Sequence, residues 1–469
     1  MDATMIVAGS MIGSGIFIVS ADITRHVGSA GWLIFVWALT GFMTISAAIS
    51  YGELSAMFPK AGGQYVYLKE SYNPLVGFLY GWSFFAVIQT ATIAAVGVAF
   101  ARFTAYFIRE AGEKNILFSF SRGGFNYHIS AAQLISIFVI VLLTYINTRG
   151  IKSGKTIQTI FTSTKLLALF GLILFGFLLA KENFWSANWH NGLQAMQDLG
   201  KKDALGALQP RGWQSIGGLT LLGAIAAAMT GSLFSSDAWN NVTFIAGEIK
   251  NPKRNIGLSL FFGTLIVTII YISTNLMYLY LLPVNRVAFP ADDRLAVAAA
   301  EVIFGDAGKS IIALLIMIST FGCINGLVLA GARVYYTMAE DGLFFRNAAR
   351  LNKNAVPQWS LWAQCIVAAI LCLSGSYGQL LDMISFVAVG FYVLTIAGIF
   401  ILRKKRPGAD RPYKAFGYPL LPAIYILLGL SFCILLIIYK PAFTWPGLVI
   451  TLIGIPIYYL VVANKTTPE

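Results

Sequence analysis

Two short stretches of glycine and serine interrupt otherwise apolar runs of the chain. They are residues 9–17 (GSMIGSGIF) and residues 231–241 (GSLFSSDAWNN). A helix that breaks at such a stretch leaves free carbonyl groups before the break and free N–H groups after it. The N–H groups and the positive end of the helix dipole suit a carboxylate, whereas the carbonyl groups suit an ammonium or another cation. Two such breaks side by side would match the outline of an α-amino acid.

The two stretches share the pattern Gly-Ser-x-x-x-Ser, at residues 9–14 and again at residues 231–236. Interrupted spans at corresponding positions of two halves are the best sequence indication of a transporter site. The alternative is that Gly13 and Gly15 only let neighbouring helices approach closely. Because both stretches carry the pattern, we favour unwound binding segments over simple packing.

Two ionisable residues lie in apolar parts of the chain, where a charge is costly and therefore indicates a function. Lys165 lies within residues 156–180, and the alternative for its long stem is to reach towards the membrane surface. Asp237 lies in the second stretch, and we expect it to cap the helix segment that follows, because Asp accepts readily from free N–H groups. If Asp237 faced the pocket instead, it would favour cationic substrates.

The elements that must position these residues are membrane-spanning helices. Hydrophobic residues make up 57% of the 469-residue chain and charged residues only 11%, against about 25% charged residues in soluble domains. This composition excludes a soluble globular enzyme, a disordered chain and a nucleic-acid binder. A spanning helix needs about 20 mostly apolar residues, so we predict an all-α integral membrane protein with twelve transmembrane helices; eleven or thirteen are the alternatives.

The twelve predicted spans are residues 3–21, 27–52, 71–101, 123–148, 156–180, 212–236, 255–285, 310–332, 354–381, 383–402, 415–439 and 441–464. Residues 374–378 form a turn, so the tenth span begins near residue 378. More Lys and Arg residues lie in the loops on the side shared by the two termini. Because short cytoplasmic loops collect these residues, we expect cytoplasmic termini in a multi-pass protein of the cell (plasma or inner) membrane.

The net charge of +13 is then a feature of topology, so we expect the lipid bilayer rather than nucleic acid as its partner. The four cysteines all lie inside spans, and no CxxC or Cys/His spacing indicates a metal site or a cofactor. No nucleophile–base constellation indicates an enzyme. The nucleotide-binding pattern GxxxxGK[ST] is missing, so transport is not powered by this chain's own nucleotide hydrolysis.

Several motifs along the whole chain are specific in combination. They are residues 13–17 (GSGIF), 51–54 (YGEL), 59–67 (PKAGGQYVY), 160–165 (IFTSTK), 234–241 (FSSDAWNN) and 248–255 (EIKNPKRN), with Asn325 and Ala332-Arg333. With them the chain resembles the amino acid–polyamine–organocation (APC) superfamily, and within it the L-type amino-acid transporter-like permeases.

This resemblance implies a LeuT-type fold with a 5+5 inverted repeat, in which helices 1 and 6 are broken. The first repeat would be residues 1–180 and the second residues 212–402, while residues 415–464 would add spans 11 and 12 to a single membrane domain. Family members move amino acids by alternating access, as exchangers or with protons.

The resemblance also implies roles for particular residues. The substrate carboxylate would meet the N–H groups of Ser14, Gly15 and Ile16. The ammonium would meet carbonyl groups near Ile12 and Phe234, and Phe234 would be the aromatic gate. The implied substrate-binding residues are therefore Ile12, Gly13, Ser14, Gly15, Ile16, Phe234 and Ser235. Polar groups in mid-span more commonly hold helices together than bind substrate, and among them Asn325 is the best candidate for a substrate contact.

Lys165 would face the first and eighth spans, where sodium-driven relatives hold a sodium ion. A tethered cation at that place would make transport independent of sodium. Lys165 would then either titrate to couple protons or stay charged in an exchanger. Related permeases often show an aromatic residue after the gate and glycine before Trp239, where this chain has serine and Ala238.

We therefore expect sodium-independent transport of L-amino acids, most simply neutral ones. The alternative within the class is a proton-coupled permease for cationic amino acids or polyamines, and the alternative from another class is a channel. In the animal branch of the family a single-span glycoprotein is disulfide-linked to the loop between spans 3 and 4. Residues 103–129 contain no cysteine, so no such heavy subunit is expected.

Overall fold

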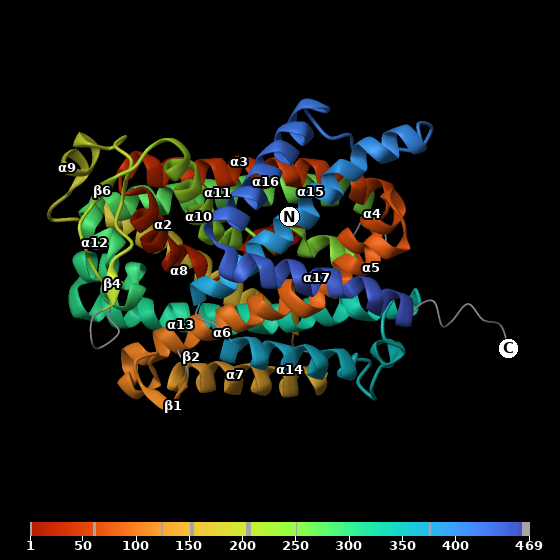
Figure 1. The fold of residues 1–469 in the computed structure, drawn as a ribbon, viewed down its shortest axis with the longest axis horizontal. Helices are drawn as coiled ribbons and strands as arrows, with labels where there is room; N and C mark the ends of the chain where they lie inside the picture. Colours follow the sequence, from red (N-terminus) through yellow and green to blue (C-terminus); the bar gives the residue numbers. More distant parts are fainter. Residues whose placement is uncertain are drawn as a thin grey trace.

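Long helices that run side by side, mostly along the longest axis of the molecule, make up the fold (Figure 1). A computed structural model describes residues 2–59, 62–122, 125–150, 154–202, 208–249, 251–374 and 377–461. Within these ranges nine helices are long and apolar enough to cross a membrane, and two shorter apolar helices cover Ser163–Leu178 and Gln358–Ser374. The chain thus has the helices of a multi-pass membrane protein.

The first part of the chain is helical apart from strands in its connections. Its helices are α1 (Asp2–Met11), η1 (Gly15–Phe17), α2 (Val19–Val27), α3 (Ala30–Met57), α4 (Gln64–Ser71), α5 (Pro74–Ser83), η2 (Phe84–Ile88), α6 (Gln89–Phe107), η3 (Arg109–Ala111), α7 (Ala131–Thr148), α8 (Gly154–Leu178) and α9 (Trp185–His190). Of these, η2 is a π-helix that joins α5 to α6.

In the described residues from Gly218 onwards, all the regular elements are helices. They are α10 (Gly218–Ser235), η4 (Trp239–Glu248), α11 (Pro252–Leu281), α12 (Val284–Ala288), η5 (Ala291–Asp293), α13 (Leu295–Glu340), η6 (Arg346–Ala349), α14 (Gln358–Ser374), α15 (Tyr377–Lys405), α16 (Leu420–Tyr439) and α17 (Pro441–Val461). Helix α13 is kinked at Gly305, whose φ is 67°.

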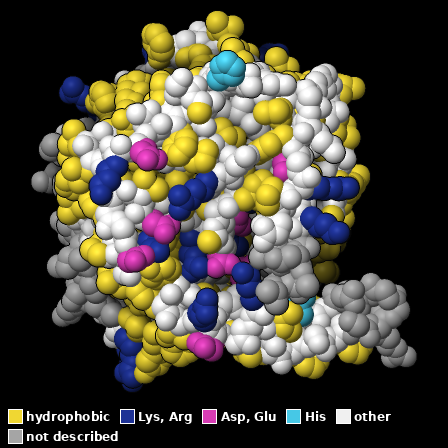
Figure 2. Space-filling view, turned by 90° about the vertical axis from the view of Figure 1, so that its left-hand side faces the viewer, with side chains coloured by type: hydrophobic (Ala, Val, Ile, Leu, Met, Phe, Trp, Pro, Cys, Tyr) yellow, Lys and Arg dark blue, Asp and Glu magenta, His cyan; other side chains and the backbone are white. Residues whose placement is uncertain are grey.

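Six short strands pair as antiparallel ribbons. They are β1 (Ile116–Arg122) with β2 (Phe125–Ser130), β3 (Met196–Gln197) with β6 (Gln214–Ser215), and β4 (Lys201–Lys202) with β5 (Leu208–Gln209). The strands gather with α9 and α12 at one end of the helix array, on the left in Figure 1. We call this the strand-bearing end, and Figure 2 views the molecule from it.

The helices differ from the predicted spans mainly at their ends. The predicted span 310–332 is part of a much longer helix, α13, and α14 ends at Ser374 where the turn was predicted. Residues 375–376 of that turn, Lys60 and Ala61 of the third motif, and the last predicted residues 462–464 lie outside the described part of the chain. The strands were not predicted, although residues 116–121 partly alternate apolar and polar side chains.

Large apolar side chains cover the outside of the helix array. Phe138, Phe170 and Leu427 are 65%, 66% and 66% exposed, respectively. Contiguous apolar surface of this kind is costly in water and suits the hydrocarbon of a bilayer. The interior is packed with aliphatic and aromatic side chains, among them Trp37, Tyr271 and Tyr278, which are almost completely buried.

Candidate functional site

The first glycine-serine stretch lies where α1 ends. Helix α1 stops at Met11, the 3-10 helix η1 begins at Gly15, and α2 begins only at Val19. The N–H groups of Phe17 and Ile18 bond three residues back, at 3.2 and 2.9 Å. Glycine weakens a helix interior because it loses much conformational freedom on folding, which explains why the chain leaves the α-helix here.

The second stretch lies where α10 ends. Helix α10 stops at Ser235 and η4 begins at Trp239. Between them Ala238 adopts the left-handed conformation with φ 62°, which is strained for a residue with a side chain. Glycine, which related permeases often have before Trp239, would adopt this conformation without strain.

The two stretches meet in the middle of the protein. Helix α1 packs against η4, and α2 packs against α10, so the two interrupted segments lie antiparallel. A Cβ atom added to Gly15 would lie only 1.9 Å from Ser235 Oγ. The hydroxyl of Tyr271 on α11 faces two carbonyl oxygens, those of Met11 at 3.1 Å and Ser235 at 2.9 Å. The structure therefore brings the predicted residues of both stretches together.

Lys165 lies against the end of α1. Its side chain comes from α8, is 3% exposed, and donates to the carbonyl oxygens of Gly9 and, at 2.7 Å, Ile12. The last carbonyls of a helix have no partner within the helix and carry the negative end of its dipole. The tethered ammonium of Lys165 donates to these unpaired carbonyls and also places a positive charge at the negative end of the dipole. The Ile12 carbonyl, predicted to receive the substrate's ammonium, thus already accepts from Lys165.

Phe234, the predicted gate, lies against a residue that the sequence did not single out. Its ring packs edge-on against the ring of Tyr377, with the centroids 6.1 Å apart. The Tyr377 hydroxyl oxygen lies 3.3 Å from Ser14 Oγ. Tyr377 is the first residue of α15, so it brings a third element to the two stretches. Its place after a turn carried no recognisable signal.

Asn325 lies on α13 and faces a different neighbour. Its side-chain oxygen accepts from Asn147 Nδ2 of α7 at 2.9 Å. Cys323, two residues earlier on α13, lies 3.5 Å from the position that a Cβ on Gly13 would take. Side chains two residues apart on a helix point about 200° apart. Asn325 therefore points away from the first stretch, and its contact joins α7 to α13.

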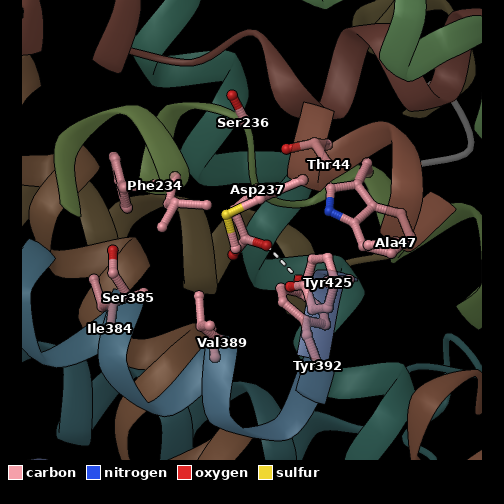
Figure 3. A pocket seen from close by; sticks show the side chains of 14 residues that line it. Thr44, Ala47, Phe234, Ser236, Asp237, Ile384, Ser385, Val389, Tyr392 and Tyr425 are labelled. Carbon is pink, nitrogen blue, oxygen red and sulfur yellow. Dashed lines mark hydrogen bonds between the residues drawn. The ribbon is translucent and has the colours of Figure 1, made fainter. Parts of the chain in front are cut away.

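Asp237 lines a cavity beside the second stretch (Figure 3). Its carboxylate accepts a hydrogen bond from the Tyr392 hydroxyl of α15. The N-cap residue of η4 is Ala238 and not Asp237, and the backbone N–H of Ala238 hydrogen-bonds to the Asp237 carboxylate. Figure 3 shows Asp237, from the segment between α10 and η4, and Tyr392 of α15 pointing towards each other. The empty space in and around this cavity, open solvent included, is about 370 Å³.

A second cavity adjoins the first, and Asp237 and Tyr392 line both. Its wall is more polar and includes Gln64, Gln89, Thr92, Asn240 and Asn241. Gln64 donates to Thr395 at 3.0 Å and accepts from Asn240 at 3.3 Å. The Asp237–Tyr392 contact thus lies in the wall that the two cavities share.

A buried ion pair closes the array at the end opposite the strands. Glu53 is fully buried and accepts from Arg403 at 2.7 and 2.9 Å and from the Ala415 N–H at 2.8 Å. Glu53 belongs to the motif at residues 51–54. Lys253, in the motif at residues 248–255, contacts Asp410 at 3.2 Å.

Among the residues that the structure describes, no group of three or more His, Cys, Asp or Glu side chains could hold a metal ion.

The sequence matches those of known transporters over its whole length. The model of the amino acid permease family matches residues 1–462. The chain is 29% identical to the serine/threonine exchanger SteT of Bacillus subtilis, over 97% of this chain and 94% of that protein. It is 27% identical to the human large neutral amino acids transporter small subunit 2, over 100% of this chain and 81% of that protein.

The mouse b(0,+)-type amino acid transporter 1 is also 27% identical, over 98% of this chain and 86% of that protein. The family and these relatives are transporters and not enzymes, which confirms both the predicted resemblance and the expectation that the chain is no enzyme. Their names all refer to amino acids, which supports amino acid transport by this multi-pass membrane protein. The chain belongs to the amino acid permease family.

Proposed function

We propose that this protein transports neutral L-amino acids across the cell membrane by alternating access, without sodium. The observation that carries the proposal is the contact of Lys165 with the carbonyls of Gly9 and Ile12. Carbonyl groups at the end of a broken helix are suited to a free cation. Because a tethered ammonium already occupies these two, a sodium ion is not needed there.

The substrate would bind at the meeting point of the two stretches. Its carboxylate would accept from the N–H groups of Ser14, Gly15 and Ile16, next to Gly13. Its ammonium would donate to the carbonyl oxygens of Phe234 and Ser235 and to the second lone pair of Ile12. The close approach of Gly15 to Ser235 supports this assignment, because groups of both stretches lie within reach of one small molecule. Asn325, which points away from the first stretch, would hold α13 to α7 through its contact with Asn147 and would not contact the substrate.

The proposed architecture is a LeuT-type fold of twelve spans. The elements α1, η1 and α2 would form one broken span, and α10 with η4 another. The remaining spans would be the other long helices together with α8 and α14. The antiparallel packing of α1 on η4 and of α2 on α10 supports two inverted repeats, residues 1–180 and 212–402, followed by residues 415–464. Both termini would be cytoplasmic, and the strand-bearing end would face outwards.

The relatives support exchange as the mode of transport, because one of them is a serine/threonine exchanger by name. We further propose that the protein works without a disulfide-linked partner, since residues 103–129, which include the β1–β2 ribbon, contain no cysteine.

A second candidate is a proton-coupled permease for cationic amino acids or polyamines. The observation that favours it is the position of Asp237 in the wall of two cavities. A carboxylate there would attract a second positive charge on the substrate. In this case the variant Asp237→Asn should lower arginine uptake much more than leucine uptake.

Uptake by purified protein in liposomes tests both candidates. Labelled alanine, leucine and arginine would be offered with and without internal unlabelled amino acid, with and without sodium, and with and without an inward proton gradient. Uptake that needs internal amino acid and ignores both gradients would support the exchanger. Arginine uptake driven by the proton gradient into empty liposomes would favour the second candidate. Strict sodium dependence would contradict the proposed role of Lys165, and uptake that internal substrate never accelerates would favour a channel.

A further inference from the structure

A cluster of ion pairs lies at the strand-bearing end, where Figure 2 shows positive and negative side chains intermingled. Its members come from α2, α6, the η3–β1 connection and the η5 segment. They are Asp22, Arg25, Arg102, Glu113, Lys114, Asp292, Asp293 and Arg294. We call this group the outer cluster.

Asp293 is the centre of the outer cluster. One carboxylate oxygen accepts from Arg25 at 2.8 Å, and the other lies 3.7 Å from a guanidinium nitrogen of Arg102. Arg25 also donates to the carbonyl of Ala288 at 2.7 Å. The side chains of Arg25 and Arg102 are only 7% and 12% exposed. Three separate segments, α2, α6 and η5, are therefore joined by ion pairs that are costly to break, because breaking them leaves buried charges unpaired.

Arg102 connects the outer cluster to the proposed substrate site. Two of its nitrogens donate to Glu113, at 2.9 and 3.1 Å, which fixes the guanidinium plane. The same guanidinium lies over the ring of Tyr377, 5.5 Å from the ring centroid. A cation over an aromatic face is attracted to it, and more strongly when water is excluded. Tyr377 also contacts Ser14 through its hydroxyl and Phe234 through its ring.

We propose that Tyr377 is a gate residue of the transporter and that Arg102, anchored by Asp293 and Glu113, holds it closed towards the strand-bearing end. The inference rests on the proposed alternating access. Tyr377 is 4% exposed, and its side chain contacts Arg102 of the outer cluster as well as Ser14 and Phe234. Opening towards this end requires the ring to leave Arg102 and Ser14 together. The pairing of Phe234 with Tyr377 thus makes the gate from α10 and α15, instead of from Phe234 alone.

A gate and a fixed structural contact predict different behaviour. If the outer cluster only stabilised the fold, weakening it would loosen the protein without favouring either side. If it holds a gate, weakening it shifts the population towards the state that is open at the strand-bearing end. The substrate site then becomes more accessible from that end and less accessible from the other.

Cys323 is a built-in reporter of this accessibility, because it lies beside Gly13 of the first stretch. The other three cysteines, Cys365, Cys372 and Cys433, would be replaced by alanine. The protein would be reconstituted in one orientation and treated with a charged, membrane-impermeant maleimide, added either outside or trapped inside the liposomes. The measured quantity is the rate of Cys323 labelling from each side.

The variants Arg102→Gln and Tyr377→Ala should raise the labelling rate from the strand-bearing end by about fivefold, and lower the rate from the opposite side. The variant Tyr377→Phe keeps the ring under Arg102 and should label within about twofold of the parent. The matched control is Arg286→Gln, which breaks an exposed ion pair with Glu301 at the same end and should change neither rate. Using both Arg102→Gln and Tyr377→Ala keeps the test valid if one variant does not fold.

Equal increases from both sides, or unchanged rates in both variants, would overturn the gate. The same holds if Arg286→Gln behaved like Arg102→Gln. Labelling needs no substrate, so the test is separable from the proposed function. Protein that takes up no amino acid but shows the side-specific shift would retain the gate and lose the substrate assignment. Protein that transports normally without the shift would retain the substrate assignment and lose the gate.

Discussion

The ammonium nitrogen of Lys165 lies 2.7 Å from the carbonyl oxygen of Ile12, at the point where α1 ends. The contact joins α8 to a helix end that would otherwise carry unpaired carbonyls inside a membrane. An unpaired backbone group in hydrocarbon costs several kcal/mol. Lys165 therefore stabilises the broken conformation of the first stretch by pairing its carbonyls, and it also supplies a positive charge there.

Replacing this lysine tests its role directly. The variant Lys165→Ala should lower amino acid exchange in liposomes by at least about tenfold, because the carbonyls of Gly9 and Ile12 lose their cation. The control is Lys253→Ala, whose ammonium makes an exposed pair with Asp410 and which should keep normal exchange. Unchanged exchange in Lys165→Ala would defeat the tethered-cation hypothesis.

Two glycines of the first stretch give a contrasting pair. A Cβ on Gly15 would lie 1.9 Å from Ser235 Oγ, whereas a Cβ on Gly13 would lie at an ordinary 3.5 Å from Cys323 Sγ. Overpacking typically costs about 1–3 kcal/mol, so Gly15→Ala should lower both the unfolding temperature in detergent and exchange. Gly13→Ala should change the unfolding temperature little. The double variant Gly15→Ala/Ser235→Gly should recover part of the loss, and equal effects of the two single variants would argue against the close contact between the two stretches.

The buried pair of Glu53 and Arg403 should contribute mainly to stability. The variant Glu53→Gln leaves Arg403 without its charged partner, and removing one member of a buried pair typically costs about 3–5 kcal/mol. The variant Glu70→Gln breaks the more exposed contact with Arg406 and should cost less than about 1 kcal/mol. Thermal unfolding in detergent compares the two. A smaller effect of Glu53→Gln than of Glu70→Gln would show that the pair is not a structural anchor.

The Asp198 carboxylate should make the stability of the connection between α9 and α10 depend on pH. Burial alone would raise the pKa of its carboxyl group, but the N–H groups of Gly212, Gly200 and Arg211 outweigh burial and lower the pKa. A lowered pKa in the folded state stabilises the connection above the ordinary Asp pKa of about 3.9, and this contribution is lost as the pH falls below it.

Hydrogen exchange of the three N–H groups, corrected for intrinsic rates, should therefore show constant protection from pH 5 to 8 and loss of protection below about pH 4. The variant Asp198→Asn should lack the extra protection throughout. The control Asp306→Asn, which breaks a surface contact with Lys309, should behave like the parent. Protection that persisted in Asp198→Asn at pH 7 would refute the explanation.

Composition and local pattern were enough to predict a helical membrane protein and the places where α1 and α10 stop, while its family was predicted from the resemblance of its motifs. Lys165 could also be found, because a lone charge in a long apolar run is conspicuous. The exact number of spans and the inverted repeat stay predictions. Partners distant in sequence could not be derived: Glu53 contacts Arg403, 350 positions away, and no periodicity encodes that pairing. Tyr377 and Arg102 were missed for the same reason, since they lie at the start of α15 and within α6 among many ordinary aromatic and basic residues.

The π-helix η2 determines how α6 is rotated relative to α5 within the span that contains both. A π-helical turn holds one residue more than an α-helical turn, and each residue of an α-helix advances the azimuth by about 100°. Deleting one residue from Phe84–Ile88 would therefore rotate everything beyond it by about that angle. Trp82 would keep its bond to Ile450, but Arg102 would point away from Asp293. The one extra residue of the π-helical turn thus sets the rotation of α6 about the helix axis, and with it the direction in which Arg102 points.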